Sequence, residues 1–219
     1  MLPNLIIPTV KRYDLLQKML NSIDYEIGQI LILDNGNKLS SDTTKFKNGT
    51  VTIVPFPSNL GVATSWNLGI KLLPHNDVWY FASDDIEFEP GTLEAWHKAS
   101  SPDHITVSDE HPHYQFFSVG ENIFRTVGFF DEGLYPSNFE DDDYNRRLEH
   151  HGLELNKVSL PHKHLKIGTA KSSQEIFDRN KETFYINEAY YNKKIEREDF
   201  SEGRWSLDTR RNNSWDTVL

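Results

Sequence analysis

Carboxylates follow two apolar runs in the first half of the chain, where they could bind a metal ion or a nucleotide. Asp34 follows the run at residues 30–33, and Asp84 and Asp85 follow the run at residues 78–82. Mg²⁺ and Mn²⁺ prefer oxygen ligands and often share them with substrate phosphates, and a carboxylate can also accept hydrogen bonds from ribose hydroxyls. An acidic turn is the alternative at both positions, and for Asp34 alone the two explanations are equally good.

A second acidic group occupies residues 140–143, Glu-Asp-Asp-Asp, at the start of a predicted helix that ends near Gly152. Acids in the first turn of a helix are often only favourable partners of its dipole, which accounts for one or two of them. Four in a row repel one another, so a charged ligand or a role in proton transfer becomes the better explanation. His162 and His164 follow, and either could bind a metal with Asp85, although a lone histidine is more often a surface or packing residue.

Asparagine and glycine form a third pattern, Asn-x-Gly-x5-Asn-x-Gly, from Asn59, Gly61, Asn67 and Gly69. Gly61 would allow the backbone to approach a ligand closely because it has no side chain, and Asn67 would lie on the helix that follows. Without further context, a glycine loop and a helix-packing contact explain these residues better.

The elements that must position these side chains alternate between strand and helix. Strands are predicted at residues 5–7, 30–33, 51–54, 78–82, 116–119 and 158–160, and helices at 15–23, 62–72, 92–96, 140–152 and, as one helix or two, 173–195. Thr92 is the candidate cap of its helix, and the polar residues 196–219 are expected to form a tail. Continuous apolar strands alternating with helices predict an α/β fold with a parallel sheet. Ligands of such sheets bind beyond the carboxyl ends of the strands, where both acidic turns should meet.

Composition narrows the function further. The chain of 219 residues has no cysteine, so any metal must be bound by carboxylates, histidines or water. Its formal net charge of −10 argues against a broad basic surface for nucleic acid. No apolar run approaches the roughly 18 residues of a membrane span, and the first residues lack the features of a signal peptide, so we expect a cytoplasmic protein.

Taken in chain order, these residues resemble the GT-A glycosyltransferases of the family-2 type, over residues 5–171. The parts that carry the resemblance are Ile6-Ile7-Pro8-Thr9 with Arg12, Leu33-Asp34-Asn35, Asn59-x-Gly61 with Asn67-x-Gly69, Ser83-Asp84-Asp85 with Pro90-Gly91, Gly128-x-Phe130-Asp131-Glu132, Glu140-Asp141-x-Asp143 with Arg147, and a late histidine. The resemblance implies a Rossmann-like, mostly parallel sheet with helices on both faces, plus a C-terminal helical extension. The catalytic domain would be residues 1–170, with a nucleotide-binding half at about 1–90 and an acceptor and catalytic half at about 91–170, and residues 171–219 would form the extension and tail.

The resemblance also implies a role for each site residue. Pro8, Thr9 and Arg12 would lie near the nucleotide, Asp34 would bind the base or ribose, and the substrate would also contact Asn59, Gly61 and Asn67. Ser83-Asp84-Asp85 is similar to the D-x-D motif that binds Mn²⁺ or Mg²⁺, with its first acid replaced by Ser83. Asp85 would then be the direct ligand and Asp84 a ribose or sugar contact. His164 would be a further metal ligand, with His162 as the alternative.

The implied reaction is the transfer of a sugar, with inversion, from a nucleotide diphosphate to an acceptor hydroxyl. The cation would neutralise the departing diphosphate, and Asp141 would be the general base, with Glu140 contacting substrate. A UDP-sugar is the donor that the resemblance suggests, and the acceptor would be a glycan or another hydroxyl-bearing molecule. A modified nucleic-acid base is a conceivable acceptor that the net charge does not support.

Two other classes of function remain open. A non-catalytic module that binds a sugar nucleotide or carbohydrate would keep Asp34 but would need neither Asp141 nor a metal-binding histidine. A nucleotidyltransferase would share the sheet and the acidic metal site. It would, however, need a glycine-rich phosphate loop after the first strand, and residues 8–12, Pro-Thr-Val-Lys-Arg, contain no glycine.

Overall fold

The computed structural model describes residues 1–39, 49–165 and 174–204, with side chains from residue 181 onward in the last helix. A seven-stranded sheet of order β3-β2-β1-β4-β7-β6-β8 forms its centre. The strands are β1 (Leu2–Thr9), β2 (Ile27–Asp34), β3 (Thr50–Pro55), β4 (Val78–Ala82), β6 (Ile105–Ser108), β7 (Phe116–Gly120) and β8 (Leu155–Val158), and a separate pair joins β5 (Ile86–Phe88) to β9 (His162–His164). The first four strands in this order are parallel, whereas β7 runs antiparallel to both of its neighbours.

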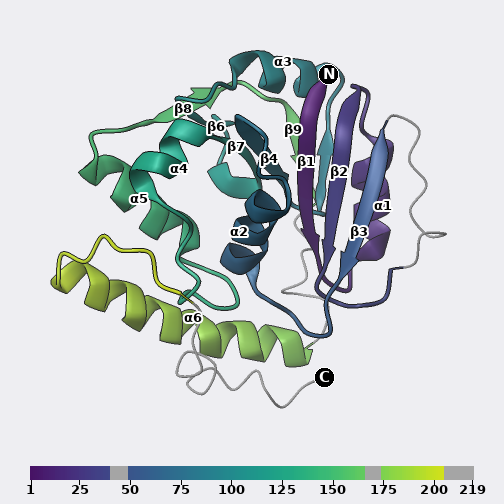
Figure 1. Cartoon of the computed structure of the whole chain (residues 1–219). Coiled ribbons are helices and arrows are strands. Elements are labelled where there is room, and N and C mark those ends of the chain that lie inside the picture. Colours follow the sequence, from purple (N-terminus) through teal and green to yellow (C-terminus); the bar gives the residue numbers. More distant parts are fainter. Residues whose placement is uncertain (40–48, 166–173, 205–219) are drawn as a thin grey trace.

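Helices cover both faces of the sheet (Figure 1). They are α1 (Tyr13–Asn21), α2 (Val62–Leu72), α3 (Thr92–Ala99), α4 (Glu121–Val127), α5 (Glu140–His150) and α6 (Gln174–Glu196), and η1 (His113–Gln115) is a short 3₁₀ turn. Side chains of α1 and α3 share one buried apolar cluster with the sheet. Those of α2, α4 and α5 share a second cluster on the opposite face.

Side chains of the central strands alternate between the two faces of the sheet, so one sheet contributes to two apolar clusters. In β1, Leu5 and Ile7 belong to the first apolar cluster and Ile6 to the second. In β4, Tyr80 belongs to the first and Phe81 to the second. Successive side chains of a strand point to opposite faces, so a strand buried on both faces must be apolar throughout. The continuous apolar runs in the sequence have this cause, and the expected α/β fold with a mostly parallel sheet is confirmed.

Some expected elements differ from those observed. The cap of α3 is Gly91, with φ of 82°, and Thr92 is the first helical residue, whose hydroxyl donates to the Pro161 carbonyl instead. The strand expected at 158–160 is observed three residues earlier, as β8. The sequence gave no signal for α4, β5 or β9, because each is at most seven residues long and too short for a periodic pattern.

The C-terminal extension contains one helix of 23 residues, α6. Figure 1 shows it along the end of the domain toward which β1 runs from the N-terminus, beneath α2 and α5. Among its side chains from residue 181 onward, the fully buried ones are polar and lie on one stripe: Thr183, Asn187 and Lys194. This part of the helix docks through hydrogen bonds and charge, together with the ring contacts of Phe184 and Tyr191 with Phe139. Within the part of the chain that the structure covers, no helix is long and apolar enough to cross a membrane.

Candidate functional site

The carboxyl ends of β1 and β4 meet at one rim, where the first acidic group lies. Thr9 ends β1, and its hydroxyl donates a 2.5 Å hydrogen bond to Asp84 Oδ2, just beyond β4. Asp84 and Asp85 are both buried. Burial raises the pKa of Asp84 to about 7, and the charge of Asp85 raises it as well, whereas the Thr9 hydrogen bond lowers it. Two neighbouring carboxylates with little access to water favour the binding of a cation.

Arg12 supplies positive charge beside this rim. It forms an ion pair with Asp14, with 2.8 Å between Nη2 and Oδ2, and the charges of Asp84 and Asp85 contribute to raising its pKa, after the larger effect of Asp14. The loop that carries it turns at Lys11, which has φ of 64°. Pro8 is half-buried within β1. Thr9 and Arg12 are therefore close to the acidic pair, as their expected roles require.

Asp85 and His164 come together although 79 residues separate them. The pairing of β5 with β9 sets Ile86 opposite His164, and His164 Nε2 lies 3.3 Å from Asp85 Oδ2. This oxygen and nitrogen can bind the same divalent cation, with substrate phosphates and water supplying further ligands. Among the described residues there is no group of three or more His, Asp or Glu side chains that could bind a metal, so the protein would contribute these two.

His162 occupies a different environment from His164. Its Nδ1 lies 3.0 Å from the Leu160 carbonyl oxygen and its Nε2 lies 2.9 Å from Gln115 Oε1. Both ring nitrogens are thus engaged by protein groups. Of the two candidate histidines, it is His164 whose ring nitrogen lies beside the Asp85 carboxylate.

Asp34 lies at the end of β2, as expected, but its carboxylate is engaged by its own loop. Its Oδ1 accepts hydrogen bonds from the Tyr13 hydroxyl and the Gly36 amide, at 2.8 and 3.0 Å. Its Oδ2 accepts from the Lys38 and Leu39 amides, at 2.7 and 2.8 Å. The side chain is fully buried. Asp34 therefore shapes the loop at the rim, whether or not it also contacts a nucleotide.

The asparagine and glycine residues before α2 make contacts within the protein. Gly61 has φ of 81°, and a Cβ there would lie 2.9 Å from the Pro136 carbonyl oxygen. The close approach that glycine allows is therefore made by another loop. Asn59 Oδ1 accepts from the Gly61 amide, and Asn67 exchanges hydrogen bonds of 2.9 and 3.0 Å with the Phe130 backbone. Contacts within the protein account for Gly61 and Asn67, and the expected substrate contacts of all three residues stay predictions.

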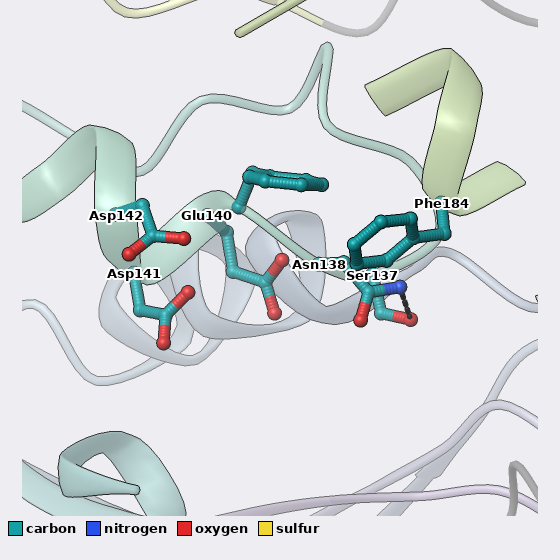
Figure 2. A pocket seen from close by; sticks show the side chains of 7 residues that line it. Ser137, Asn138, Glu140, Asp141, Asp142 and Phe184 are labelled. Carbon is teal, nitrogen blue, oxygen red and sulfur yellow. Dashed lines mark hydrogen bonds between the residues drawn. The ribbon is translucent and has the colours of Figure 1, made fainter. Parts of the chain in front are cut away.

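A pocket of about 300 Å³ lies at the start of α5. Figure 2 shows the carboxylates of Glu140 and Asp141 side by side, with the ring of Phe184 beyond them. The pocket is lined by Ser137, Asn138, Phe139, Glu140, Asp141, Asp142 and Phe184. Asp141 is half-buried and Asp142 is exposed. The predicted base is therefore open to a substrate.

Glu140 has an unusual electrostatic environment. Its side chain is buried, and its Oε2 atom has no hydrogen-bond partner among the described residues. Burial raises the pKa of Glu140 to about 8, and the nearby charge of Asp141 contributes in the same direction. Near neutral pH this carboxyl group is largely protonated, and it can donate or accept a hydrogen bond.

Behind the pocket, the fourth acid of the run forms part of a buried charge network. Asp143 pairs with Arg147 on the next turn of α5, at 2.8 Å, and with Lys194 of α6, at 2.7 Å. Lys194 also pairs with Asp131. All four side chains are at most 4% exposed. Asp131 and Asp143, found in the sequence as parts of motifs, thus fix α5 to α6, and the role of Lys194 was not expected.

A chain of contacts joins the rim to the pocket. The Asn35 amide donates to the Thr9 carbonyl, at 2.9 Å, and Asn35 Oδ1 accepts from the Leu60 amide. The next residues along the chain bring Gly61 against Pro136, with the Val62 amide donating to the Pro136 carbonyl at 2.7 Å. Pro136 directly precedes the pocket lining. The acidic pair at the rim and the pocket therefore belong to one continuous edge of the molecule.

Solved glycosyltransferases have the same fold at low sequence identity. GalNAc-T7, solved with UDP, GalNAc and Mn²⁺, matches with a TM-score of 0.61 and 13% identity, over 74% of this chain and 43% of that one. The catalytic domain of Drosophila beta1,4galactosyltransferase 7, solved with xylobiose, matches with 0.55 and 15%, over 78% and 72%. S. aureus TarS matches with 0.52 and 13%, over 73% of this chain. These matches confirm the GT-A fold.

A nucleotidyltransferase has a similar fold as well. The inositol-1-phosphate CTP transferase from T. maritima matches with a TM-score of 0.52 and 10% identity, over 81% of this chain and 94% of that one. The chain spans 35% of the length of TarS and 58% of its residues 1–349. No protein-family model matches the sequence, and no curated protein matches it in sequence.

Proposed function

We propose that this protein is an inverting, metal-dependent glycosyltransferase that uses a nucleotide diphosphate sugar. The observation that carries the proposal is the pairing of Asp85 with His164 at a rim that is joined to a pocket containing Asp141. The GT-A fold shared with UDP-bound GalNAc-T7 supports it. The donor half would be residues 1–90 and the acceptor half residues 91–170, with the extension contributing Phe184 to the pocket.

A divalent cation fits the rim. Asp85 and His164 would bind it, and Asp84, held by Thr9, would face the ribose or the sugar. The bound cation would neutralise the negative charge that develops on the leaving diphosphate. Arg12, near the acidic pair, would contribute a second positive charge to the same phosphates.

Asp141 would act as the general base. It lies in the first turn of α5, half-buried in the pocket, where an acceptor hydroxyl can reach it. As the acceptor oxygen attacks the anomeric carbon, Asp141 would take its proton, and the bond to the diphosphate would break on the opposite face of the sugar. Glu140, buried beside it, would orient the acceptor by hydrogen bonding.

Donor hydrolysis tests this proposal without knowledge of the acceptor. We expect slow release of nucleotide diphosphate from at least one of UDP-, GDP- and dTDP-sugars with Mn²⁺, and its loss in EDTA. Calorimetry should show that UDP, or the diphosphate of the donor accepted, binds more tightly with Mn²⁺. This difference should disappear in Asp85→Asn and persist in the exposed control Asp142→Asn. Equal affinity with and without metal would exclude the role of the cation.

Nucleotidyl transfer is the alternative that one fold match favours. It would require a sugar phosphate and a nucleoside triphosphate as substrates, with release of pyrophosphate. Supplying CTP or UTP with sugar 1-phosphates and measuring pyrophosphate separates the two reactions. The loop 8–12, which turns at Lys11 without glycine, makes sugar transfer our expectation.

A further inference from the structure

The pocket beside Asp141 has two chemically different walls. One wall is formed by the carboxyl groups of α5. The other is the ring of Phe184, which comes from α6, a helix outside the catalytic domain, and is 38% exposed. Figure 2 shows the Glu140 carboxyl group between the Phe184 ring and Asp141. The volume of about 300 Å³ is at the lower end of the range of about 300–1,000 Å³ for small-molecule sites, so it suits one small ring.

The aromatic wall is fixed in place by its neighbours. The Phe184 ring packs against Phe139, with 5.0 Å between centroids, and Phe139 stacks on Tyr191 at 5.6 Å. One turn along α6, Asn187 Nδ2 donates to the Ser137 carbonyl at 2.8 Å and so ties the helix to the pocket loop. An aromatic side chain that is exposed and held rigidly can offer its face to a ligand at little entropic cost.

One carboxyl oxygen of this wall has no hydrogen-bond partner among the described residues. Glu140 is 8% exposed, and its Oε2 has no partner among the described residues although the group lies on the pocket. Buried polar atoms are nearly always satisfied, so an orphaned oxygen facing a pocket indicates that a ligand supplies the partner. With Glu140 protonated near neutral pH and Asp141 beside it, hydroxyl groups match this wall better than phosphates or carboxylates, which the acids would repel.

We propose that this pocket binds a single uncharged pyranose at the end of the acceptor, with its C–H face on Phe184 and its hydroxyls on Glu140 and Asp141. This inference rests on the proposed function and names its acceptor as a neutral carbohydrate. One hydroxyl at Asp141 is then the nucleophile, and Phe184 determines specificity. A nucleic-acid acceptor would also bring a ring to stack, but its phosphates would meet the carboxylates of Asp141 and Asp142.

Ligand-observed NMR with methyl pyranosides tests the proposal independently of catalysis. We expect at least one neutral glycoside among the gluco, galacto, manno and N-acetylglucosaminide forms to bind, with ring-current shifts on one face of the sugar. Phe184→Ala should weaken this binding by about three- to tenfold, the effect of losing one aromatic contact, and Phe184→Trp should restore it. Tyr185→Ala is the matched control, because Tyr185 is 58% exposed on the same helix and does not line the pocket.

The competing ligands decide the outcome. Methyl glucuronide, glucose 6-phosphate and oligothymidylate should each bind more weakly than the best neutral glycoside. A preference for any of these three, no binding of any neutral glycoside, or an equal loss in Tyr185→Ala would overturn the proposal. If the protein binds a pyranoside but hydrolyses no nucleotide sugar, the sugar site is supported and the proposed transferase function is refuted.

Discussion

Replacing Asp141 by Asn tests the reaction most directly. The change keeps the shape of the side chain and removes its ability to accept a proton. Because Asp141 is half-buried at the surface of the pocket, the variant should fold normally. Loss of a general base lowers a rate by about 10²–10⁴-fold, which corresponds to about 3–5.5 kcal/mol of transition-state stabilisation.

A second effect of this change follows from Glu140. The charge of Asp141 contributes to the raised pKa of Glu140, so Asp141→Asn should lower that pKa and ionise Glu140 in part at neutral pH. An ionised Glu140 could take over some proton acceptance. The residual rate should therefore rise with pH, and the measured loss should be smaller at pH 9 than at pH 6.

Donor binding and a matched variant complete the assay. Asp141→Asn should bind the donor diphosphate with Mn²⁺ as tightly as the wild type, because the rim residues that would hold the donor are unchanged. Asp142→Asn removes an exposed carboxylate from the next position of α5 and should lower the transfer rate far less than Asp141→Asn does. Asp143 is unsuitable as a control, because its buried pairs with Arg147 and Lys194 support the fold. If Asp141→Asn retains full transfer while Glu140→Gln is inactive, Glu140 is the base and our assignment is wrong.

Three further variants test the surroundings of the site. Asp34→Ala should lower the melting temperature by about 4–12 °C as well as weaken nucleotide binding, because buried amides lose their acceptor; an unchanged melting temperature in thermal denaturation would refute the structural role. Lys194→Met should destabilise the fold by about 3–5 kcal/mol in urea unfolding, because it leaves Asp131 and Asp143 buried without their shared cation, whereas the exposed Lys193→Met should cost little. Glu140→Gln should flatten the pH dependence of stability: the folded pKa of about 8 lies above the ordinary 4.5, so wild-type stability is fully present below pH 4.5 and falls until about pH 8. Equal slopes in the two proteins between these limits would contradict the raised pKa.

The parts of the fold that the sequence predicted well are those with a continuous apolar signal. The predicted limits of α2 and β4 coincide with the observed ones. In β4, both cores require apolar side chains, so the run begins and ends where the strand does. The sequence predicted β7 as a strand but did not predict its antiparallel direction. That direction depends on the connection through β6 and η1, which has no local sequence pattern.

Individual site residues were predictable where one strand end determines their place. The end of β4 places Asp85 at the rim, whereas its proximity to His164 was implied only by the resemblance, because β5 and β9, which bring the two together, left no signal in the sequence. Gly61 was different: the sequence indicated a close approach but not the approaching group, which is Pro136 from 75 residues away. Likewise, the four acids of α5 look alike in sequence, and only the packing of α6 separates Asp143, in its ion pairs, from Asp141, in the pocket.

The polar stripe of α6 explains both why the extension was hard to interpret and why it matters. Thr183, Asn187 and Lys194 follow helical spacing, but periodicity is normally sought in apolar residues, so the buried face of this helix resembles a solvated one. A helix that docks through hydrogen bonds and a buried lysine requires specific partners. Lys194 pairs with Asp131 and Asp143, and Asn187 donates to the backbone at Ser137. Those partners belong to residues 131–143, which include most of the lining of the pocket at the start of α5. If the proposed function holds, changes in the exposed residues of α6, such as Phe184, would therefore alter which acceptor is bound, while the polar stripe keeps the helix in place and the rim at Asp85 remains intact.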